Sequence, residues 1–211
     1  MAEYNVVHLD EIERASYLGS NLIPVRYTLG FRAAGTNAWA ADTGGQLIPP
    51  HTEDAGSEEM YVVVRGRAKF TVGEEKADVP AGTVVYVPPE VFRTAEAEED
   101  GTVVFAVGGK IGQPFDGGNW DTYAVADELR RGDRVEEGRE VLRQAREDRP
   151  DSWAMAYNSG CWEVFAGNHD AAFEHLRRAR ELNADAVRPY LDEDSDLDPL
   201  RDDPRWEELT K

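Results

Sequence analysis

The chain has 211 residues, with 42 acidic and 23 basic side chains and a formal net charge of −19. Because a surface of that charge repels phosphate backbones and anionic lipid headgroups, we expect neither nucleic acid nor a membrane among its partners. The length allows one large domain or two small ones, and the single cysteine, Cys161, leaves no intrachain disulfide to form.

Residues 3–107 predict short strands separated by turn residues. The segments rich in β-branched and aromatic side chains lie at 6–9, 24–31, 37–41, 60–65, 68–72, 83–87 and 102–107, with a helical turn near 10–15. Short strands at spacings of about 8–12 residues are typical of an all-β sandwich or barrel. Residues 108–119 then hold five glycines and one proline, which is the composition of a linker.

The pattern after this stretch is helical. Helices are predicted at 120–131, 134–148, about 152–166 and 170–182, and Gly132-Asp133 recurs 35 residues later as Gly167-Asn168. The second helix pair resembles a tetratricopeptide repeat, whereas the first has Gly138 near the place where that repeat has Ala. The tail is expected to dock by four apolar side chains: Leu197, Leu200, Trp206 and Leu209. We therefore predict an α+β chain with domains at 1–110 and 120–211, joined by a Gly-rich linker at 111–119.

Two motifs carry the information on function. The first has Gly45, then His51, Glu53 and Glu59, and ends at Gly66; the second runs from residue 80 to Arg93. Together they resemble the two signature motifs of the cupin family, whose fold is an RmlC-like jelly-roll barrel, also called a double-stranded β-helix. In that family the positions of Glu53 and Arg93 are normally histidines. The interval from Glu53 to Glu59 is one or two residues longer than usual.

The resemblance implies that the signature residues point into the barrel mouth. His51 and Glu53 are two residues apart, as are Glu59 and Tyr61, so each pair shares a side if its segment is extended. Arg93 would reach the same place from another strand. The predicted ligand-binding residues are thus His51, Glu53, Glu59, Tyr61 and Arg93.

The chemistry of this site has two readings. One imidazole and two carboxylates can hold Fe, Mn, Ni or Zn, which would make His51, Glu53 and Glu59 metal ligands. A guanidinium, however, has no lone pair to give a metal, and it can itself neutralise Glu53 or Glu59. We favour a pocket without a metal, in which Arg93 pairs with one of these glutamates.

Three hypotheses follow for the function. We favour a non-catalytic module that binds a small molecule at a degenerate metal site, fused to helices that contact a protein partner or stabilise a dimer. The alternatives are a metal-dependent oxygenase or isomerase and a pure interaction scaffold. The resemblance also implies a homodimer. The absence of a charged-then-apolar leader and of an apolar run of about 18 residues predicts a cytoplasmic protein.

Overall fold

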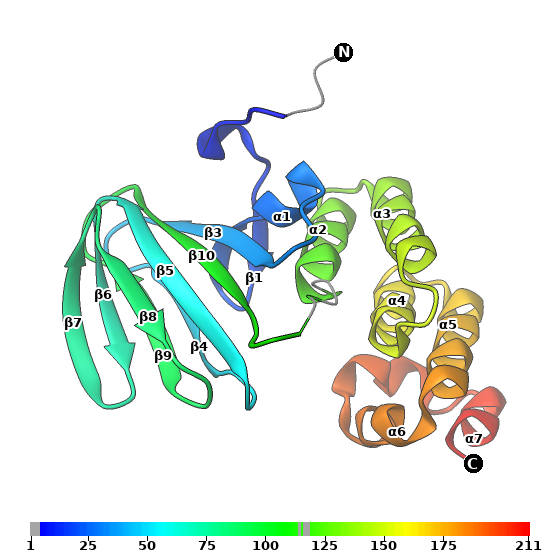
Figure 1. Ribbon diagram of the computed structural model, residues 1–211. Helices are drawn as coiled ribbons and strands as arrows, with labels where there is room; N and C mark the ends of the chain where they lie inside the picture. The colour runs from blue at the N-terminus through cyan, green and yellow to red at the C-terminus, as the bar shows by residue number, and fades with distance from the viewer. Residues whose placement is uncertain (1–4, 114, 116–118) are drawn as a thin grey trace. The chain divides into compact units, whose positions relative to one another are not determined.

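The computed structural model describes residues 5–113, 115 and 119–211, which form two compact units at 1–118 and 119–211. Figure 1 shows strands in the first unit and helices in the second. The predicted α+β class is confirmed. Part of the predicted linker, residues 114 and 116–118, lies outside the described residues.

The first unit consists of two antiparallel sheets. The larger has the order β1-β2-β3-β10-β5-β8, and the smaller has the order β4-β9-β6-β7. Their bounds are β1 Ala15–Tyr17, β2 Ser20–Ile23, β3 Gly35–Ala41, β4 Gln46–Thr52, β5 Ser57–Arg65, β6 Arg67–Val72, β7 Glu75–Pro80, β8 Val84–Val87, β9 Phe92–Ala97 and β10 Thr102–Lys110.

The two sheets are held together by side chains that alternate along the strands. In β9 of the smaller sheet the buried positions are Arg93, Ala95 and Ala97, and in β5 of the larger sheet Tyr61 and Val63 are buried on either side of Val62. This period of two places one face of each sheet in a shared core. The Arg93 side chain therefore points inward with the apolar residues of its strand.

Two predicted strands are wrong. Residues 24–31 form a short helix, α1 Val25–Leu29, which ends at Gly30 with φ 64° and caps its last turn through the Gly30 N–H. A short apolar run does not distinguish strand from helix, and here Gly30 supplies the left-handed cap that ends a helix. Residues 6–9 also form no strand: Leu9–Glu11 is a 3-10 helix, and Val7 and Leu9 pack on a core cluster that includes Ile12.

The second unit contains the four predicted helices within two residues of their expected starts and ends. They are α2 Asn119–Arg131, α3 Val135–Asp148, α4 Trp153–Phe165 and α5 His169–Leu182. The Ser152 and Asn168 side chains cap α4 and α5 by accepting backbone N–H groups. The helices α2 and α3 pack together, as do α4 and α5, but their tetratricopeptide character stays a prediction.

The tail of the chain is also helical. It contains α6 Ala184–Glu193, a 3-10 helix Ser195–Leu200 and α7 Pro204–Thr210. Leu197, Leu200 and Leu209 are buried in the core formed with α4 and α5, and Trp206 packs against it. The predicted docking of the tail is thus confirmed. Within the described part of the chain, none of the helices has the length and hydropathy that crossing a lipid bilayer requires.

Gly138 allows α3 to approach α2 closely. A Cβ atom at this position would lie 2.7 Å from the Ala126 carbonyl oxygen and 2.7 Å from the fully buried Trp162 ring. We expect Gly138→Ala to destabilise the protein by about 1–3 kcal/mol, because overpacking outweighs the better helix propensity of alanine. Thermal unfolding followed by circular dichroism measures this. Gly132→Ala is the matched control, since its Cβ would lie an ordinary 3.5 Å from the Glu128 carbonyl oxygen; equal effects of the two changes would contradict the packing argument.

Candidate functional site

The five predicted site residues lie together at one end of the β unit. His51 is near the end of β4 and Glu53 directly follows that strand, while Glu59 and Tyr61 lie on β5 and Arg93 on β9. His51 and Arg93 are directly opposite each other in the β4–β9 ladder. Because β4 and β9 belong to the smaller sheet and β5 to the larger, the site forms where the two sheets face each other.

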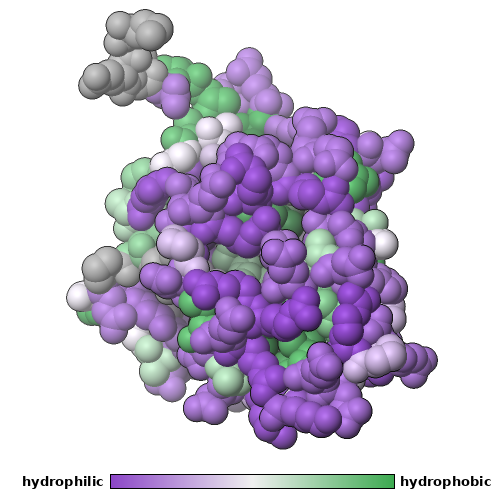
Figure 2. All heavy atoms as spheres, turned by 90° about the vertical axis from the view of Figure 1, so that its right-hand side faces the viewer, coloured by the Kyte–Doolittle hydropathy of each residue, from purple (hydrophilic) through white to green (hydrophobic). Residues whose placement is uncertain are grey.

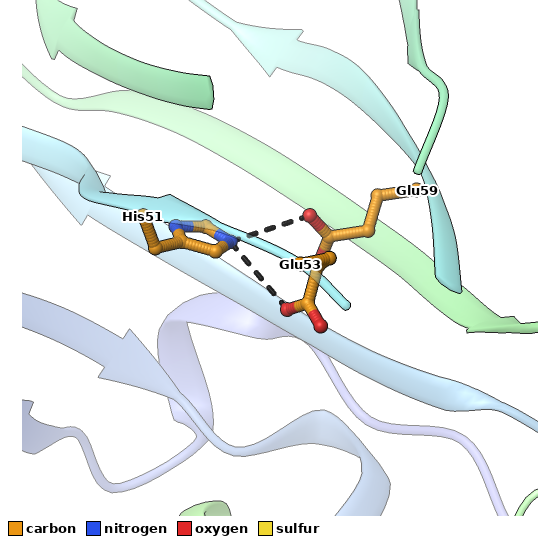
Figure 3. A group of neighbouring side chains, drawn as sticks. All are labelled: His51, Glu53 and Glu59. Atoms are coloured by element: carbon orange, nitrogen blue, oxygen red, sulfur yellow. Dashed lines mark hydrogen bonds and ion pairs between the residues drawn. The ribbon is translucent and has the colours of Figure 1, made fainter. Parts of the chain in front are cut away.

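One carboxylate oxygen of Glu59 joins most of the site. Glu59 Oε2 accepts a hydrogen bond from the Tyr61 hydroxyl at 2.5 Å and lies 3.2 Å from Arg93 Nε and 3.4 Å from His51 Nε2. His51 Nε2 also lies 3.6 Å from Glu53 Oε1. Figure 3 shows the His51 ring directed at both carboxylates. The pairing of Arg93 with a pocket glutamate is therefore present, and the partner is Glu59.

The site residues are buried to different depths. The Arg93 side chain is 0% exposed and Tyr61 is 1% exposed, whereas the side chains of Glu59, His51 and Glu53 are 18%, 31% and 38% exposed. A solvent-accessible layer of one imidazole and two carboxylates thus lies over a buried layer of guanidinium and phenol. A ligand arriving from solvent would meet His51 and Glu53 first.

A backbone carbonyl fixes the orientation of the His51 ring. His51 Nδ1 lies 2.7 Å from the Pro49 carbonyl oxygen. Because a carbonyl oxygen only accepts, Nδ1 carries a hydrogen. Nε2 then faces the two glutamates, either as a lone pair in the neutral ring or as a second N–H in the imidazolium ion.

The ionisation of the site follows from its contacts. Burial lowers the pKa of His51, but the hydrogen bonds to Glu59 and Pro49 and the Glu59 charge outweigh it and leave that pKa raised. Burial also raises the pKa of Glu59, but His51, Tyr61 and the charge of Arg93 bring it below its ordinary value. Burial and the Glu59 charge raise the pKa of Glu53, and the same two causes raise that of Tyr61. The contacts therefore favour an ionised Glu59 next to a charged His51.

This ionisation predicts a pH dependence of stability. The contacts that raise the His51 pKa stabilise the folded state. This stabilisation is complete at pH values below the unfolded pKa of about 6.5, and it is lost as pH rises through the pKa of the folded state. The urea midpoint of the wild type should therefore fall, relative to that of His51→Gln, as pH rises from below about 6.5 through the raised pKa of the folded state. A bound divalent cation would give the opposite trend, because it needs the neutral ring.

Arg93 is incompletely hydrogen-bonded in this layer. Its Nη2 donates to the Pro88 carbonyl oxygen at 3.4 Å, while Nε and Nη1 are buried and form no hydrogen bond with any described residue. A buried guanidinium that lacks hydrogen bonds needs a nearby negative charge to offset the free-energy cost of its desolvation. Glu59 is that charge, at 3.2 Å.

Gly108 is a part of the site that the sequence analysis missed. Residues 108 and 109 were expected to end the last strand, but β10 continues to Lys110 and places Gly108 directly opposite Glu59. A Cβ at Gly108 would lie 2.9 Å from Glu59 Cγ and 3.4 Å from Glu59 Oε1. Because Gly108 has no side chain, the Glu59 side chain can occupy this space. A glycine inside an apolar strand was the available signal.

Three of these side chains have the donor types that a divalent cation binds. One donor atom from each of His51, Glu53 and Glu59 can be chosen so that all lie within 4.8 Å of one another. Cations with ligand distances of about 2.1 Å place neighbouring donors about 3–3.5 Å apart, so small side-chain movements would bring this set to such a spacing. Arg93, which is itself a cation, lies next to the same Glu59 oxygen.

Cys161 lies apart from this site, in the helical unit. It is 4% exposed, and burial together with the Asp194 charge raises the pKa of its thiol. Burial and a raised pKa are typical of an unreactive structural thiol.

A protein-family model matches part of the β unit. Residues 39–108 match the family model described as "Cupin domain". An uncharacterized protein of Streptomyces coelicolor is 41% identical over 86 residues, which cover 39% of this chain and 74% of that protein.

Solved structures similar to the chain include three bacterial proteins. A cupin protein from Bacteroides fragilis is 19% identical, with 56% of this chain and 98% of that chain covered and a TM-score of 0.43. KdgF from Halomonas sp. is 19% identical, covering 47% and 88%, with a TM-score of 0.41. A predicted oxalate decarboxylase from Thermotoga maritima is 19% identical, covering 51% and 100%, with a TM-score of 0.42.

Proposed function

Residues 39–108 form a cupin domain, and we propose that this domain binds a small polar molecule at a degenerate metal site without a metal ion. The contact between Arg93 and Glu59 carries this proposal: a fully buried guanidinium lies 3.2 Å from the carboxylate that a metal would need. In this state Arg93 balances the charge of Glu59, and the raised pKa of His51 favours its protonated form beside Glu53 and Glu59. The internal cation replaces the charge that a metal ion would bring.

A divalent cation would disturb that balance. It would have to displace the proton of His51 and would add two positive charges beside a guanidinium that cannot lose its own. The desolvated position of Arg93 makes this repulsion stronger than it would be in water. The full set of residues therefore fits a ligand better than it fits an ion.

The ligand would contact the accessible layer first. His51 offers an N–H donor and Glu53 a carboxylate acceptor, and their nearest polar atoms are 3.6 Å apart. This pair suits a molecule that has an acidic or carbonyl group for His51 and a hydroxyl or amino group for Glu53. Contact of Tyr61 and Arg93 with the ligand stays a prediction, since both lie below Glu59.

Elemental analysis of the purified full chain tests the proposal. After incubation with Fe(II), Mn(II), Ni(II) or Zn(II) and desalting, we expect far less than one ion per chain, and no difference between the wild type and His51→Ala. Near-stoichiometric metal that is lost in His51→Ala would contradict the metal-free pocket. His175→Ala is the matched control, because this histidine lies in the helical unit.

A metal-dependent enzyme is the second candidate, favoured by one specific observation. The Pro49 carbonyl holds His51 with Nε2 toward both glutamates, which is the orientation a ligand imidazole needs. His51, Glu53 and Glu59 would hold the ion, which would supply Lewis-acid or redox chemistry. Arg93 would act through Glu59, by keeping that carboxylate ionised and in place.

We further propose that the helical unit is an interaction module of the tetratricopeptide type and that the protein is a homodimer. The repeat offset of 35 residues and the packed helix pairs support the first part. The second part derives from the cupin resemblance. Sedimentation of the full chain tests it: a single species with the mass of one chain at micromolar concentration would contradict the dimer.

A further inference from the structure

The helical unit contains a groove of about 590 Å³ that is separate from the barrel site. It is formed by the end of α3, the start of α4 and the middle of α5. Five arginines line it: Arg143, Arg146, Arg149, Arg177 and Arg178. The volume is within the range of small-molecule and peptide pockets.

The charge of this groove is opposite to that of its surroundings. Residues 119–211 contain 14 basic and 24 acidic side chains, yet five of those 14 line this one groove. Three glutamates, at 147, 174 and 181, also line it, so positive charge is in excess there. The visible surface of the helical unit is mostly hydrophilic (Figure 2), so recognition here would depend on charge.

The arginines of the groove differ in how far they are already neutralised. Arg143 pairs with Glu140 and Glu147, and Arg178 Nη1 lies 3.5 Å from Glu181. Arg146 and Arg177 have no carboxylate within ion-pair distance among the residues that the structure describes. Arg146 is half-buried and donates to the Ser159 hydroxyl at 2.8 Å. Its position is thus fixed while its charge is left for another partner.

We propose that this groove binds an acidic peptide segment of a protein partner. The planar guanidinium groups of Arg146 and Arg177 match the geometry of Asp and Glu carboxylates. The groove glutamates can accept peptide N–H groups, whereas a nucleic-acid backbone supplies no such donors and is repelled by the net charge of −19. This assignment is independent of the barrel site, and the failure of either leaves the other intact.

A binding assay with a defined probe tests the assignment. Fluorescence anisotropy of a fluorescein-labelled hexaglutamate peptide, titrated with the full chain at low salt, should show saturable binding. Arg146→Gln/Arg177→Gln should weaken it by about tenfold or more, and added salt should weaken binding to the wild type. Because Arg177 is exposed, Arg177→Glu alone should also weaken binding without disturbing the core.

Arg188→Gln is the matched control for this assay. Arg188→Gln changes an exposed arginine of α6 outside this groove and should leave binding unchanged. No saturable binding, or equal binding by the double variant, would overturn the proposal. Displacement of the peptide by an oligothymidine at equal charge concentration would also overturn it and would assign the groove to nucleic acid. Circular dichroism of each variant confirms that it is folded.

Discussion

Arg93→Met should cost about 3–5 kcal/mol of stability in the β unit, which is the loss typical of breaking a buried ion pair. The methionine fills a similar volume, but Glu59 is left as a mostly buried carboxylate without its guanidinium partner at 3.2 Å. The Glu59 pKa should rise, because the Arg93 charge is one of the causes that lower it, while the hydrogen bonds of His51 and Tyr61 remain. Hydrogen exchange of the β4, β5 and β9 amides measures the loss in this unit without interference from the helices.

Arg67→Met is the matched control for this measurement. Arg67 also pairs with two carboxylates, Asp78 at 2.8 Å and Glu99 at 3.3 Å, but its side chain is 37% exposed. Exposed pairs contribute little, so this change should alter exchange far less. If both changes had the same small effect, Arg93 would not be neutralising a buried charge, and the main reason for excluding a metal ion would be gone.

The residues of the site could be predicted from the sequence because they lie in spaced motifs on extended segments. His51 with Glu53, and Glu59 with Tyr61, are two residues apart, and the period of a strand places such pairs on one side. Their depth could not be predicted. Whether Arg93 lies above or below Glu59 depends on how two sheets pack, and no local pattern encodes that.

The errors in the fold prediction have local causes. The segment that forms α1 has the β-branched and aromatic composition of a strand, but Gly30 at φ 64° provides the left-handed cap that ends a short helix. The residue pattern did not indicate the strand β9; only the resemblance to the cupin family placed Arg93 on a strand. Its outward side chains are polar and its inward positions hold small alanines and an arginine, so its hydrophobic signal is weak.

Glu59→Gln should destabilise the β unit by about 3–5 kcal/mol as well, for the complementary reason. The amide keeps the shape of the carboxylate, but it removes the negative charge nearest to Arg93, whose Nε and Nη1 already have no hydrogen bond among the described residues. His51 would lose the charge of Glu59, one of the two partners that raise its pKa, so the pH dependence predicted for the wild type should weaken in this variant.

The double variant Arg93→Met/Glu59→Gln separates this explanation from simple loss of packing. If the two single changes are costly because each leaves one charge buried alone, removing both charges together should cost less than the sum of the two single losses, by a coupling energy of about 1–3 kcal/mol measured by hydrogen exchange. Additive losses would mean that the two side chains act independently. In that case no cationic side chain would neutralise Glu59. Its uncompensated negative charge would favour a bound cation at His51, Glu53 and Glu59.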